Sequence, residues 1–308
     1  MRKHAVSGIR LLVPIEAFPY DYSSMISCPL CRERLEVSFK AHGHPICRCV
    51  ACGHLTVAIE IERAAHVRTT YGDQYFSGGG AGYTDYLAEG ELLRERGRGY
   101  ARLLRPHLPS PGWMLDVGAA AGFLLKGYQD EGWQGFGVEP NARMAEVART
   151  SNGVQVACAA FEDYQAPRRF DLVSMIQVIA HFLDPAAAMA QAASLLSPGG
   201  FVLIETWDRE SYAAKVFGKG WHEYSPPSVV QWFSKDGLTS LAGHHGLKLV
   251  ATGRPQRSIQ AGHTASLLRY KLNGSLAGKV ARPLLGLVPP GLKVPYLGDD
   301  LFWALYRA

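Results

Sequence analysis

The sequence contains no hydrophobic run that approaches the ~18 residues needed to span a bilayer, and its first residues lead into no apolar signal-peptide core. We therefore expect a soluble, cytoplasmic protein. Charge is sparse as well, because charged residues make up 19% of the chain and the formal net charge is only +5. Such a weak charge argues against nucleic acid as a partner, since surfaces that bind nucleic acid are strongly basic. No feature of the sequence indicates an oligomeric state.

Cysteine is scarce, but four of the six cysteines form two closely spaced pairs. Two residues separate Cys28 from Cys31 and Cys49 from Cys52, and seventeen residues lie between the pairs. Two C-x2-C pairs at this distance can surround a zinc ion with four thiolates. We therefore predict a zinc ribbon in residues 1–65, with free thiols or disulfides as the alternatives. A metal with four protein ligands has no position left for a substrate, so this zinc would be structural.

The residues around the cysteine pairs have the pattern of a small sheet. Alternating side chains predict strands at 35–39, 46–49 and 55–59, with a turn between the first two. Cys47 is left over from the predicted metal site. We expect His54 to lie on the surface rather than to act as a fifth ligand.

An apolar strand followed by a glycine-containing turn forms the centre of the chain. Asp116 ends the strand, Gly118 permits a tight turn, and Gly122 allows the next helix to approach the sheet closely. Compared with a dinucleotide-binding turn, Ala120 replaces the second glycine and Phe123 the third. These side chains, with an acid at the strand end, disfavour a diphosphate. The turn therefore suits a ligand without phosphates.

This stretch resembles the first motif of the class I S-adenosylmethionine (SAM)-dependent methyltransferases, an acid followed by G-x-G-x-G. The resemblance implies an α/β, Rossmann-like fold and SAM as the cofactor. It places SAM against the turn, at Asp116, Gly118, Ala119, Gly122 and Phe123.

Glu139 ends the expected second strand and lies 21 residues after the first glycine of the turn. At this spacing a carboxylate reaches the ribose hydroxyls of the cofactor, and we expect Pro140 to contact the cofactor as well. The alternative for Glu139 is an exposed acid at a strand end. After the third strand the family usually has an acid for the adenine amino group. Here we expect adenine to lie against Phe161, with Glu162 or Asp163 as its polar partner.

Residues 170–185 resemble the family's fourth-strand motif, in which Phe-Asp and apolar residues precede an acid-histidine pair. Ala180 replaces the acid, whereas His181 is retained. The resemblance places Gln177 at the methionine end of the cofactor and His181 towards the substrate. A purely structural hydrogen bond is the alternative for His181. Ser197–Gly200 resembles the family's Pro-Gly-Gly turn before the fifth strand.

The last expected strand, at 301–306, would lie antiparallel beside the sixth, at 247–251. This arrangement gives the family's strand order 3-2-1-4-5-7-6, and residues 254–300 then form an insertion. The chain from Arg254 onwards carries eight Lys or Arg and two Asp residues, so the excess charge is concentrated there. A basic, apolar insertion suits peripheral contact with an anionic membrane or a lipid phosphate. Burial as ordinary core is the alternative.

Residues 66–112 combine a tyrosine- and glycine-rich stretch with an amphipathic helix expected at 89–104. The faces of tyrosine rings stabilise a sulfonium cation, so we expect a lid in which Tyr71 and Tyr75 contact the cofactor. A linker with surface-packed tyrosines is the alternative.

The loop at 219–228 concentrates His, Glu, Tyr and Trp on the substrate side of the sheet. We expect His222 to act as a general base and Glu223 to orient it. A tryptophan-rich plug is the alternative.

Together these motifs resemble the zinc-ribbon-bearing methyltransferases of bacteria, many of which act on small molecules or glycans. After the ribbon and the lid with its helix, residues 113–308 would form the SAM-binding domain. The implied reaction methylates an O, N or C nucleophile of a small molecule, lipid or glycan, and the basic insertion suggests an anionic one. An RNA methyltransferase is one alternative. A non-catalytic zinc-ribbon adaptor is another, because Ala120 and Ala180 depart from the motifs.

Overall fold

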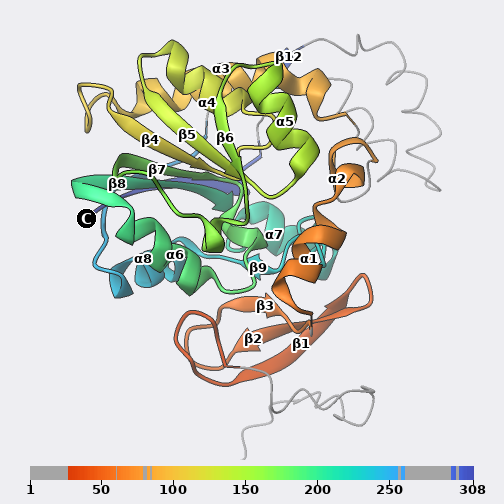
Figure 1. The fold of residues 1–308 in the computed structure, drawn as a ribbon. Coiled ribbons are helices and arrows are strands. Elements are labelled where there is room, and N and C mark those ends of the chain that lie inside the picture. Colours follow the sequence, from red (N-terminus) through yellow and green to blue (C-terminus); the bar gives the residue numbers. More distant parts are fainter. Residues whose placement is uncertain are drawn as a thin grey trace, which may run out of the picture.

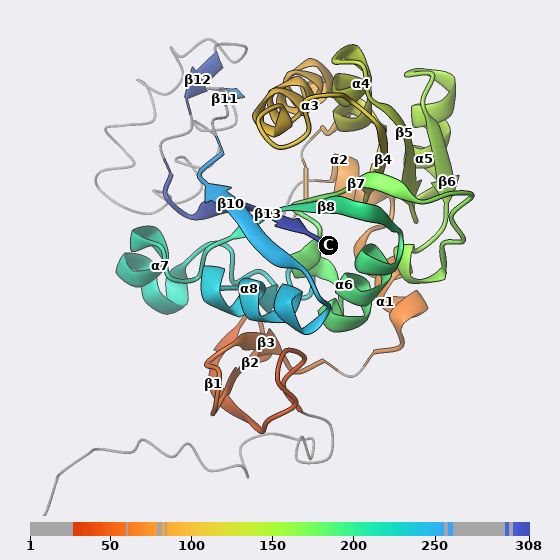
Figure 2. The same cartoon turned by 90° about the vertical axis from the view of Figure 1, so that its left-hand side faces the viewer.

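The computed structural model describes residues 27–59, 61–78, 82–83, 85–255, 258–260, 293–295 and 298–308. A large α/β sheet forms its centre, and the cysteine-rich ribbon lies to one side (Figure 1, Figure 2). Most of the expected insertion at 254–300 lies outside the described residues. In the part of the chain that is described, no helix is both long and apolar enough to cross a membrane.

The central seven-stranded sheet has the predicted strand order. Its strands are β4 (Trp113–Val117), β5 (Gln134–Glu139), β6 (Gln155–Cys158), β7 (Phe170–Ile176), β8 (Leu196–Trp207), β10 (Lys248–Gly253) and β13 (Leu301–Arg307). They follow one another as β10-β13-β8-β7-β4-β5-β6. Strands β4 to β8 are parallel, and β13 lies antiparallel between β8 and β10. The Rossmann-like class I methyltransferase fold is therefore confirmed.

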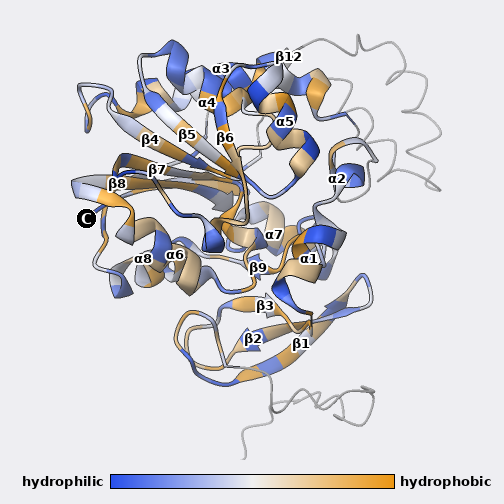
Figure 3. Cartoon of the chain, viewed as in Figure 1, coloured by the Kyte–Doolittle hydropathy of each residue, from blue (hydrophilic) through white to orange (hydrophobic). Residues whose placement is uncertain are grey.

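Helices cover both faces of this sheet (Figure 1). One face carries α3 (Gly90–Leu104), α4 (Phe123–Asp130) and α5 (Ala142–Thr150), and the other carries α6 (Pro185–Ser194) and α8 (Lys235–His244). Met114 and Leu125 belong to the first core, and Met189 and Ile204 to the second. Figure 3 shows hydrophobic residues along the strands between the two helix layers. The parallel strands are apolar because both of their faces are buried.

The helix starts follow the capping residues of the sequence. The side chains of Asn141, Asp184 and Ser234 accept hydrogen bonds from backbone N–H groups in the first turns of α5, α6 and α8. Each cap satisfies amides that the helix itself leaves without a partner. Pro185 follows its cap directly, where its missing N–H costs nothing. The three helices therefore begin at residues whose side chains suit the capping position.

α3 crosses α4 at a pair of glycines. A Cβ atom on Gly97 would lie 2.2 Å from the carbonyl oxygen of Leu124, and one on Gly127 would lie 2.0 Å from that of Arg94. The two helix backbones therefore approach more closely than any side chain would permit. This contact seats α3 beside the turn that follows β4.

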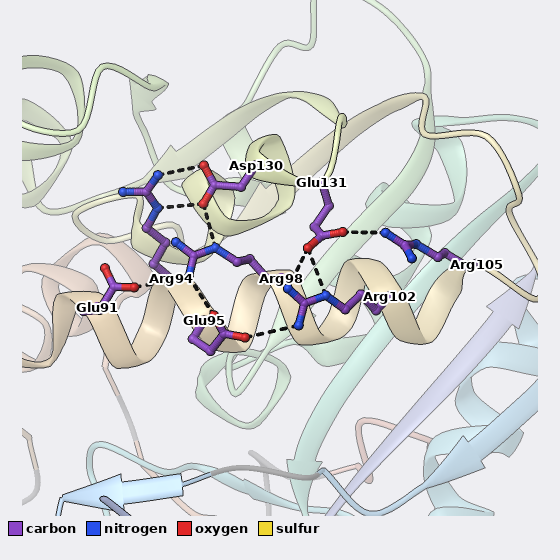
Figure 4. Close-up of polar contacts among 8 residues, drawn as sticks. All are labelled: Glu91, Arg94, Glu95, Arg98, Arg102, Arg105, Asp130 and Glu131. Atoms are coloured by element: carbon purple, nitrogen blue, oxygen red, sulfur yellow. Dashed lines mark hydrogen bonds and ion pairs between the residues drawn. The ribbon is translucent and has the colours of Figure 1, made fainter. Parts of the chain in front are cut away.

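Ion pairs surround the same helix contact (Figure 4). The network consists of Glu91, Arg94, Glu95, Arg98, Arg102, Arg105, Asp130 and Glu131. Asp130 binds two arginines of α3, and Arg94 meets it through both Nε and Nη2 at 2.7 Å. Exposed pairs of this kind contribute little each, so the glycine contact decides how tightly the helices pack.

Replacing Gly97 with alanine is expected to lower the free energy of unfolding by about 2 to 3 kcal/mol, because the helices must separate. Gly99 provides a matched control on the same helix, since a Cβ atom there meets nothing within 4 Å. Gly99→Ala is expected to stabilise the helix by up to about 1 kcal/mol. Urea unfolding of both variants measures the difference. Equal changes in the two variants would contradict the close helix contact.

The ribbon forms the predicted small sheet from β1 (Leu35–Ala41), β2 (His44–Cys49) and β3 (Leu55–Val57). His42 and Gly43 join β1 to β2 with φ angles of 46° and 82°, as a two-residue hairpin turn of type I′ requires. A fourth strand, β9 (Gln231–Trp232), comes from far along the chain and pairs with β3. The ribbon sheet is therefore completed by the body of the protein.

The ribbon also shares its core with that body. Cys28 and Leu30 belong to the same buried cluster as Phe233 and Leu238, near the start of α8. His54 is only 2% exposed, so its expected surface position is wrong. The docking of β9, which no local pattern indicates, buries this histidine.

Short elements connect these parts. They are α1 (Arg63–Thr70), α2 (Asp73–Ser77), α7 (Tyr212–Phe217), η3 (Leu87–Glu89), η4 (Phe161–Asp163), η5 (Ile179–His181), η6 (Gly218–Gly220) and the antiparallel pair β11 (Ser258–Gln260) and β12 (Lys293–Pro295). The η elements are single turns of 3₁₀ helix. α1 and α2 lead from the ribbon to the side of the sheet where the parallel strands end (Figure 1).

Candidate active site

A cavity lies where the carboxyl ends of β4, β5 and β7 face α1 and α2, the usual ligand position in an open α/β sheet. About 1060 Å³ of empty space lies in and around it, part of which is open solvent. Many predicted site residues line it: Tyr71, Tyr75, Gly118, Glu139, Pro140, Phe161, Glu162, Gln177 and His181. The other predicted residues of the body lie outside its lining: Asp116, Ala119, Gly122, Phe123, His222 and Glu223.

The turn after β4 keeps its left-handed conformations although its middle glycine is missing. Gly118 and Gly122 have φ angles of 70° and 76°, and Ala120 reaches 45°. A Cβ atom on Gly118 would lie 2.3 Å from Cγ2 of Val178, so only glycine fits there. At Ala120 the turn accepts a methyl group, and the amide still points at Glu139. The alanine therefore leaves the form of the turn intact.

Glu139 holds two backbone amides at the end of β5. Its Oε2 accepts from the N–H of Ala120 at 2.9 Å, and its Oε1 accepts from that of Asn141 at 2.8 Å. Burial raises the pKa of this carboxyl group to about 7, although both amide bonds act in the opposite direction. Each oxygen retains a lone pair that can accept a hydroxyl group. The carboxylate can therefore bind a diol while it fixes the turn.

Asp116 lies behind the turn and not in the cavity wall. Its side chain is 2% exposed, and Oδ2 has no hydrogen-bond partner among the described residues. Burial raises its pKa to about 7, and the nearby hydroxyl group of Ser174 counteracts part of this shift. The carboxyl group thus belongs to a buried polar region beneath the turn.

Gln177 presents an unpaired donor beside the cavity. Its φ angle of 58° is uncommon for a residue other than glycine. Its side-chain Nε2 is buried and has no hydrogen-bond partner among the described residues. Buried donors normally have partners, so this one fits a ligand that carries an acceptor, such as the carboxylate of SAM.

His181 and Tyr71 meet at the backbone carbonyl of Ser228. The Tyr71 hydroxyl donates to this oxygen at 2.7 Å, and Nδ1 of His181 does so at 2.7 Å. Because a carbonyl only accepts, Nδ1 carries the proton and Nε2 keeps the lone pair. Burial lowers the pKa of His181 and lowers that of the neighbouring His66 to about 4, so both rings are neutral near pH 7. The structural hydrogen bond considered for His181 is present, and the same ring lines the cavity.

His222 and Glu223 form the expected pair in the loop at 219–228, but the pair lies outside the lining of the cavity. Nε2 of His222 lies 2.8 Å from Oε1 of Glu223. The His222 ring packs beside Trp207 and Trp221. Its side chain is 35% exposed, and neither member of the pair lines the cavity. The loop therefore packs His222 beside two tryptophans and does not present the pair to the cavity.

Several lining residues were not predicted from the sequence: Arg63, His66, Tyr83, Tyr86 and Arg96. The two tyrosines belong to the stretch predicted as a lid, so its composition was the available signal. Arg96 pairs with the fully buried Glu205 at the end of β8, 109 residues away. No local pattern connects two such distant residues.

The four cysteines of the ribbon come together as predicted. Their sulfur atoms lie within 4.8 Å of one another, with Cys28 3.6 Å from Cys52 and Cys31 3.4 Å from Cys49. Thiolates around a tetrahedral zinc ion are about 3.8 Å apart, so the four sulfurs fit this metal. Backbone amides point at the sulfurs of Cys28 and Cys49, each at 3.4 Å. Cys47 is outside the cluster, and burial raises the pKa of its thiol to about 11.

Sequence comparison identifies the family to which the central part of the chain is similar. A family described as Methyltransferase domain matches residues 89–252. The ubiquinone biosynthesis O-methyltransferase of Bradyrhizobium sp. (strain ORS 278) is 30% identical over 128 residues, which are 36% of this chain and 51% of that protein. The corresponding protein of Rhodopseudomonas palustris (strain HaA2) is 28% identical over 148 residues, 45% of this chain and 58% of the relative. The chain thus spans little more than half the length of these relatives.

Solved structures show the same fold. The 1,6-didemethyltoxoflavin-N1-methyltransferase of Burkholderia thailandensis, with bound 1,6-didemethyltoxoflavin and S-adenosylhomocysteine (SAH), has a TM-score of 0.51 and 17% identity. That match covers 88% of this chain and 98% of the other. The magnesium protoporphyrin IX methyltransferase of Synechocystis PCC 6803, with bound SAH, has a TM-score of 0.50 and 13% identity, covering 78% and 99% of the two chains. At these identities the likeness concerns the fold alone.

Proposed function

The chain belongs to the methyltransferase family whose domain model matches residues 89–252, and we propose that it methylates a small, uncharged organic molecule. The reaction would take place in the cavity between α1, α2 and the carboxyl ends of the parallel strands. The protein is a SAM-dependent methyltransferase. The family membership favours an enzyme over a non-catalytic adaptor. The intact turn around Ala120 also supports this choice, because Ala120 was one of the two departures from the motifs that suggested an adaptor.

The observation that carries the proposal is that one cavity joins Glu139 to the aromatic lid. We place the ribose of SAM on the Glu139 carboxylate and the adenine beside Phe161 and Glu162. The methionine end then lies at the turn after β4 and at the unpaired donor of Gln177. In this orientation the sulfonium group faces the ring of Tyr75, whose negative face attracts a cation.

The cavity wall favours an uncharged, ring-containing acceptor. Its lid side is built from aromatic rings that meet edge to face, as in the pairs Tyr71–Tyr75 and Tyr83–Tyr86. The described arginines in the lining are paired with acids, Arg63 with Asp163 at 2.8 Å and Arg96 with Glu205. These acids neutralise the two charges, while Nη1 of Arg63 and Nε of Arg96 have no hydrogen-bond partner among the described residues and can still donate to an uncharged acceptor. The related O-methyltransferases support an oxygen nucleophile, and we propose a ring hydroxyl as the methylated group.

The residues of this chain would align the acceptor and take its proton. SAM supplies an electrophilic methyl group when it is bound. The lid rings hold the acceptor ring against the cavity wall, which replaces a bimolecular encounter with a fixed approach. His181 is neutral and carries its lone pair on Nε2, so it can accept the hydroxyl proton at that atom. We assign His222 and Glu223 to the support of the adjacent loop.

Replacing His181 with glutamine is expected to lower kcat about 100-fold, the usual contribution of a general base. The affinity for SAH should change less than about threefold, because no more than about 0.7 kcal/mol of cofactor binding is lost. His222→Gln is the matched control and should retain most of the activity. A large loss of kcat in the His222 variant, with normal activity in the His181 variant, would reverse the two roles.

SAH affinity is expected to rise as the pH increases from about 5 to 7 and to level off near 8. The pKa of Glu139 is raised to about 7 in the unliganded protein, so this group is protonated below that pH. A carboxylate accepts the ribose hydroxyls better than a carboxylic acid does, and binding must therefore release the proton at low pH. Calorimetry across this range measures the slope. A flat profile would show that Glu139 does not face the ribose.

The proposed activity is tested by transfer of labelled methyl groups from SAM. Separate pools of hydroxylated aromatic compounds, lipids, glycans and RNA serve as acceptors. We expect label in the aromatic pool. Label only in RNA would support the RNA methyltransferase alternative, and label only in lipids or glycans would contradict the proposed acceptor class.

We further propose that Cys28, Cys31, Cys49 and Cys52 hold a structural zinc ion, supported by the distances between their sulfur atoms. All four positions of a tetrahedral ion would be filled by protein, so the metal would stabilise the ribbon and take no part in methyl transfer. The ribbon, the lid with its helix, and the SAM-binding domain would then be three parts of one folded unit.

A further inference from the structure

One side chain connects the ribbon with the wall of the cavity. Gln231 lies in β9, pairs with Thr56 of the ribbon sheet and is 3% exposed. Its Oε1 lies 2.8 Å from Nε2 of His54 in the ribbon. Its Nε2 donates to the carbonyl oxygens of Phe182 at 3.2 Å and Leu183 at 3.3 Å. Both of these residues line the cavity.

The hydrogen bonds determine how each group is oriented. Two carbonyl oxygens can only accept, so the amide nitrogen of Gln231 must face Phe182 and Leu183. The amide oxygen then faces His54, which must carry its proton on Nε2. Nε2 of His54 therefore donates this bond to the amide oxygen at 2.8 Å. The bridge therefore has one consistent arrangement of donors and acceptors.

The ribbon end of the bridge is anchored in the second cysteine knuckle. The carbonyl oxygen of His54 accepts from the N–H of Cys49 at 2.8 Å. Folding of the knuckle therefore fixes the backbone from which the His54 ring projects. The ring also packs against Phe233, with centroids 5.1 Å apart.

The backbone of Val230 forms a second link between the ribbon and the segment that lines the cavity. Its carbonyl oxygen accepts from the N–H of Val57 at 3.0 Å, and its own N–H donates to Ala180 at 2.9 Å. Ala180 belongs to η5, directly before His181 and Phe182. The ribbon, β9 and η5 therefore form a continuous hydrogen-bonded layer that ends at the cavity.

We propose that Gln231 is a positioning residue through which the folded ribbon holds Phe182 and Leu183 in place for cofactor binding. This inference rests on the proposed function, because it concerns the cavity assigned to SAM. The Phe182 ring lies 6.0 Å from that of Phe161, where we place adenine. Loss of the Gln231 amide leaves the part-buried carbonyl groups of Phe182 and Leu183 without their donor. They must turn towards other partners, and Phe182 moves with them.

The test replaces Gln231 with methionine, which has a similar shape but no amide. In the full chain with its metal, Gln231→Met is expected to weaken SAH binding about tenfold while the metal content is unchanged. Amide hydrogen exchange should accelerate in residues 178–184. Thr56→Val is the matched control, because it removes only a 3.2 Å side-chain bond to the carbonyl of Val230. The backbone bonds of Val230 to Val57 and Ala180 and both bonds of the Gln231 amide remain. It should leave SAH affinity and exchange at 178–184 unchanged.

His54→Phe provides a second variant in case the methionine variant does not fold. Its ring can keep the contact with Phe233, and only the ribbon end of the bridge is lost. We expect about a threefold weaker affinity for SAH and faster exchange in the same segment. Wild-type affinity and exchange in a folded Gln231→Met variant would overturn the inference. A wild-type protein that does not bind SAH would refute the proposed function instead, and the exchange measurement would still test the bridge.

Discussion

Replacing Glu139 with alanine is expected to weaken SAH binding about 1000-fold. The carboxylate is placed to accept two ribose hydroxyls, and charge-assisted hydrogen bonds contribute roughly 1.5 to 3 kcal/mol each. Loss of both corresponds to about 4 kcal/mol, or three orders of magnitude in affinity. The variant also frees the amides of Ala120 and Asn141, so the turn after β4 loses its anchor. Isothermal calorimetry with SAH measures the combined effect.

The matched control for this variant is Glu146→Ala on the neighbouring α5. Glu146 is exposed and pairs only with the nearby Arg149 among the ion pairs of the described residues. Its replacement should leave SAH affinity unchanged. Thermal unfolding of both unliganded variants separates loss of binding from loss of structure. Binding by Glu139→Ala within about threefold of wild type would remove Glu139 from the cofactor site, because that change is below ~0.7 kcal/mol.

Replacing Cys49 with serine is expected to abolish metal binding and to lower the free energy of unfolding by more than about 4 kcal/mol. Cys49 is 1% exposed and supplies one of the four sulfurs of the cluster. A ribbon of this size has too little core to fold without its metal. Because the ribbon shares a core with Phe233 and Leu238, its unfolding should also expose the body around α8. Metal analysis and thermal unfolding of the purified variant measure both effects.

Cys158 offers a control for the cysteine chemistry, because it is exposed and lies outside the cluster. Cys158→Ser should retain one equivalent of zinc and the wild-type melting temperature. Protein prepared without added zinc should contain one equivalent as well. A content below about half an equivalent in the wild type, or full metal in Cys49→Ser, would remove the proposed zinc site.

The sheet was predictable because its signals are local. Units of an apolar strand, a turn and a helix recur along the chain, and each can be recognised within about twenty residues. The first unit turns at Gly118 and Gly122. Their repetition leaves few possible topologies, since crossover connections have one hand. Glu139 was predictable in the same way, because its distance from the turn is set by one helix and one strand.

The contacts between distant segments could not be predicted from such signals. Gln231 meets His54 across 177 residues, and Arg96 meets Glu205 across 109. Each pair depends on how whole elements dock, which a local pattern does not record. His222 illustrates the same limit, because its loop lies on the predicted side of the sheet while the ring packs against Trp207 and Trp221. Residue type indicated a base, but only the packed loop shows where the ring lies.

A crystal structure of the full chain with SAH tests the central claim most directly, namely that SAM binds at the end of β5 in the lid-covered cavity. We expect the ribose hydroxyls within hydrogen-bonding distance of both Glu139 oxygens, adenine beside Phe161, and the amino acid end near Nε2 of Gln177. SAH bound elsewhere, or bound in the cavity with Glu139 contacting only its two backbone amides, would contradict this account.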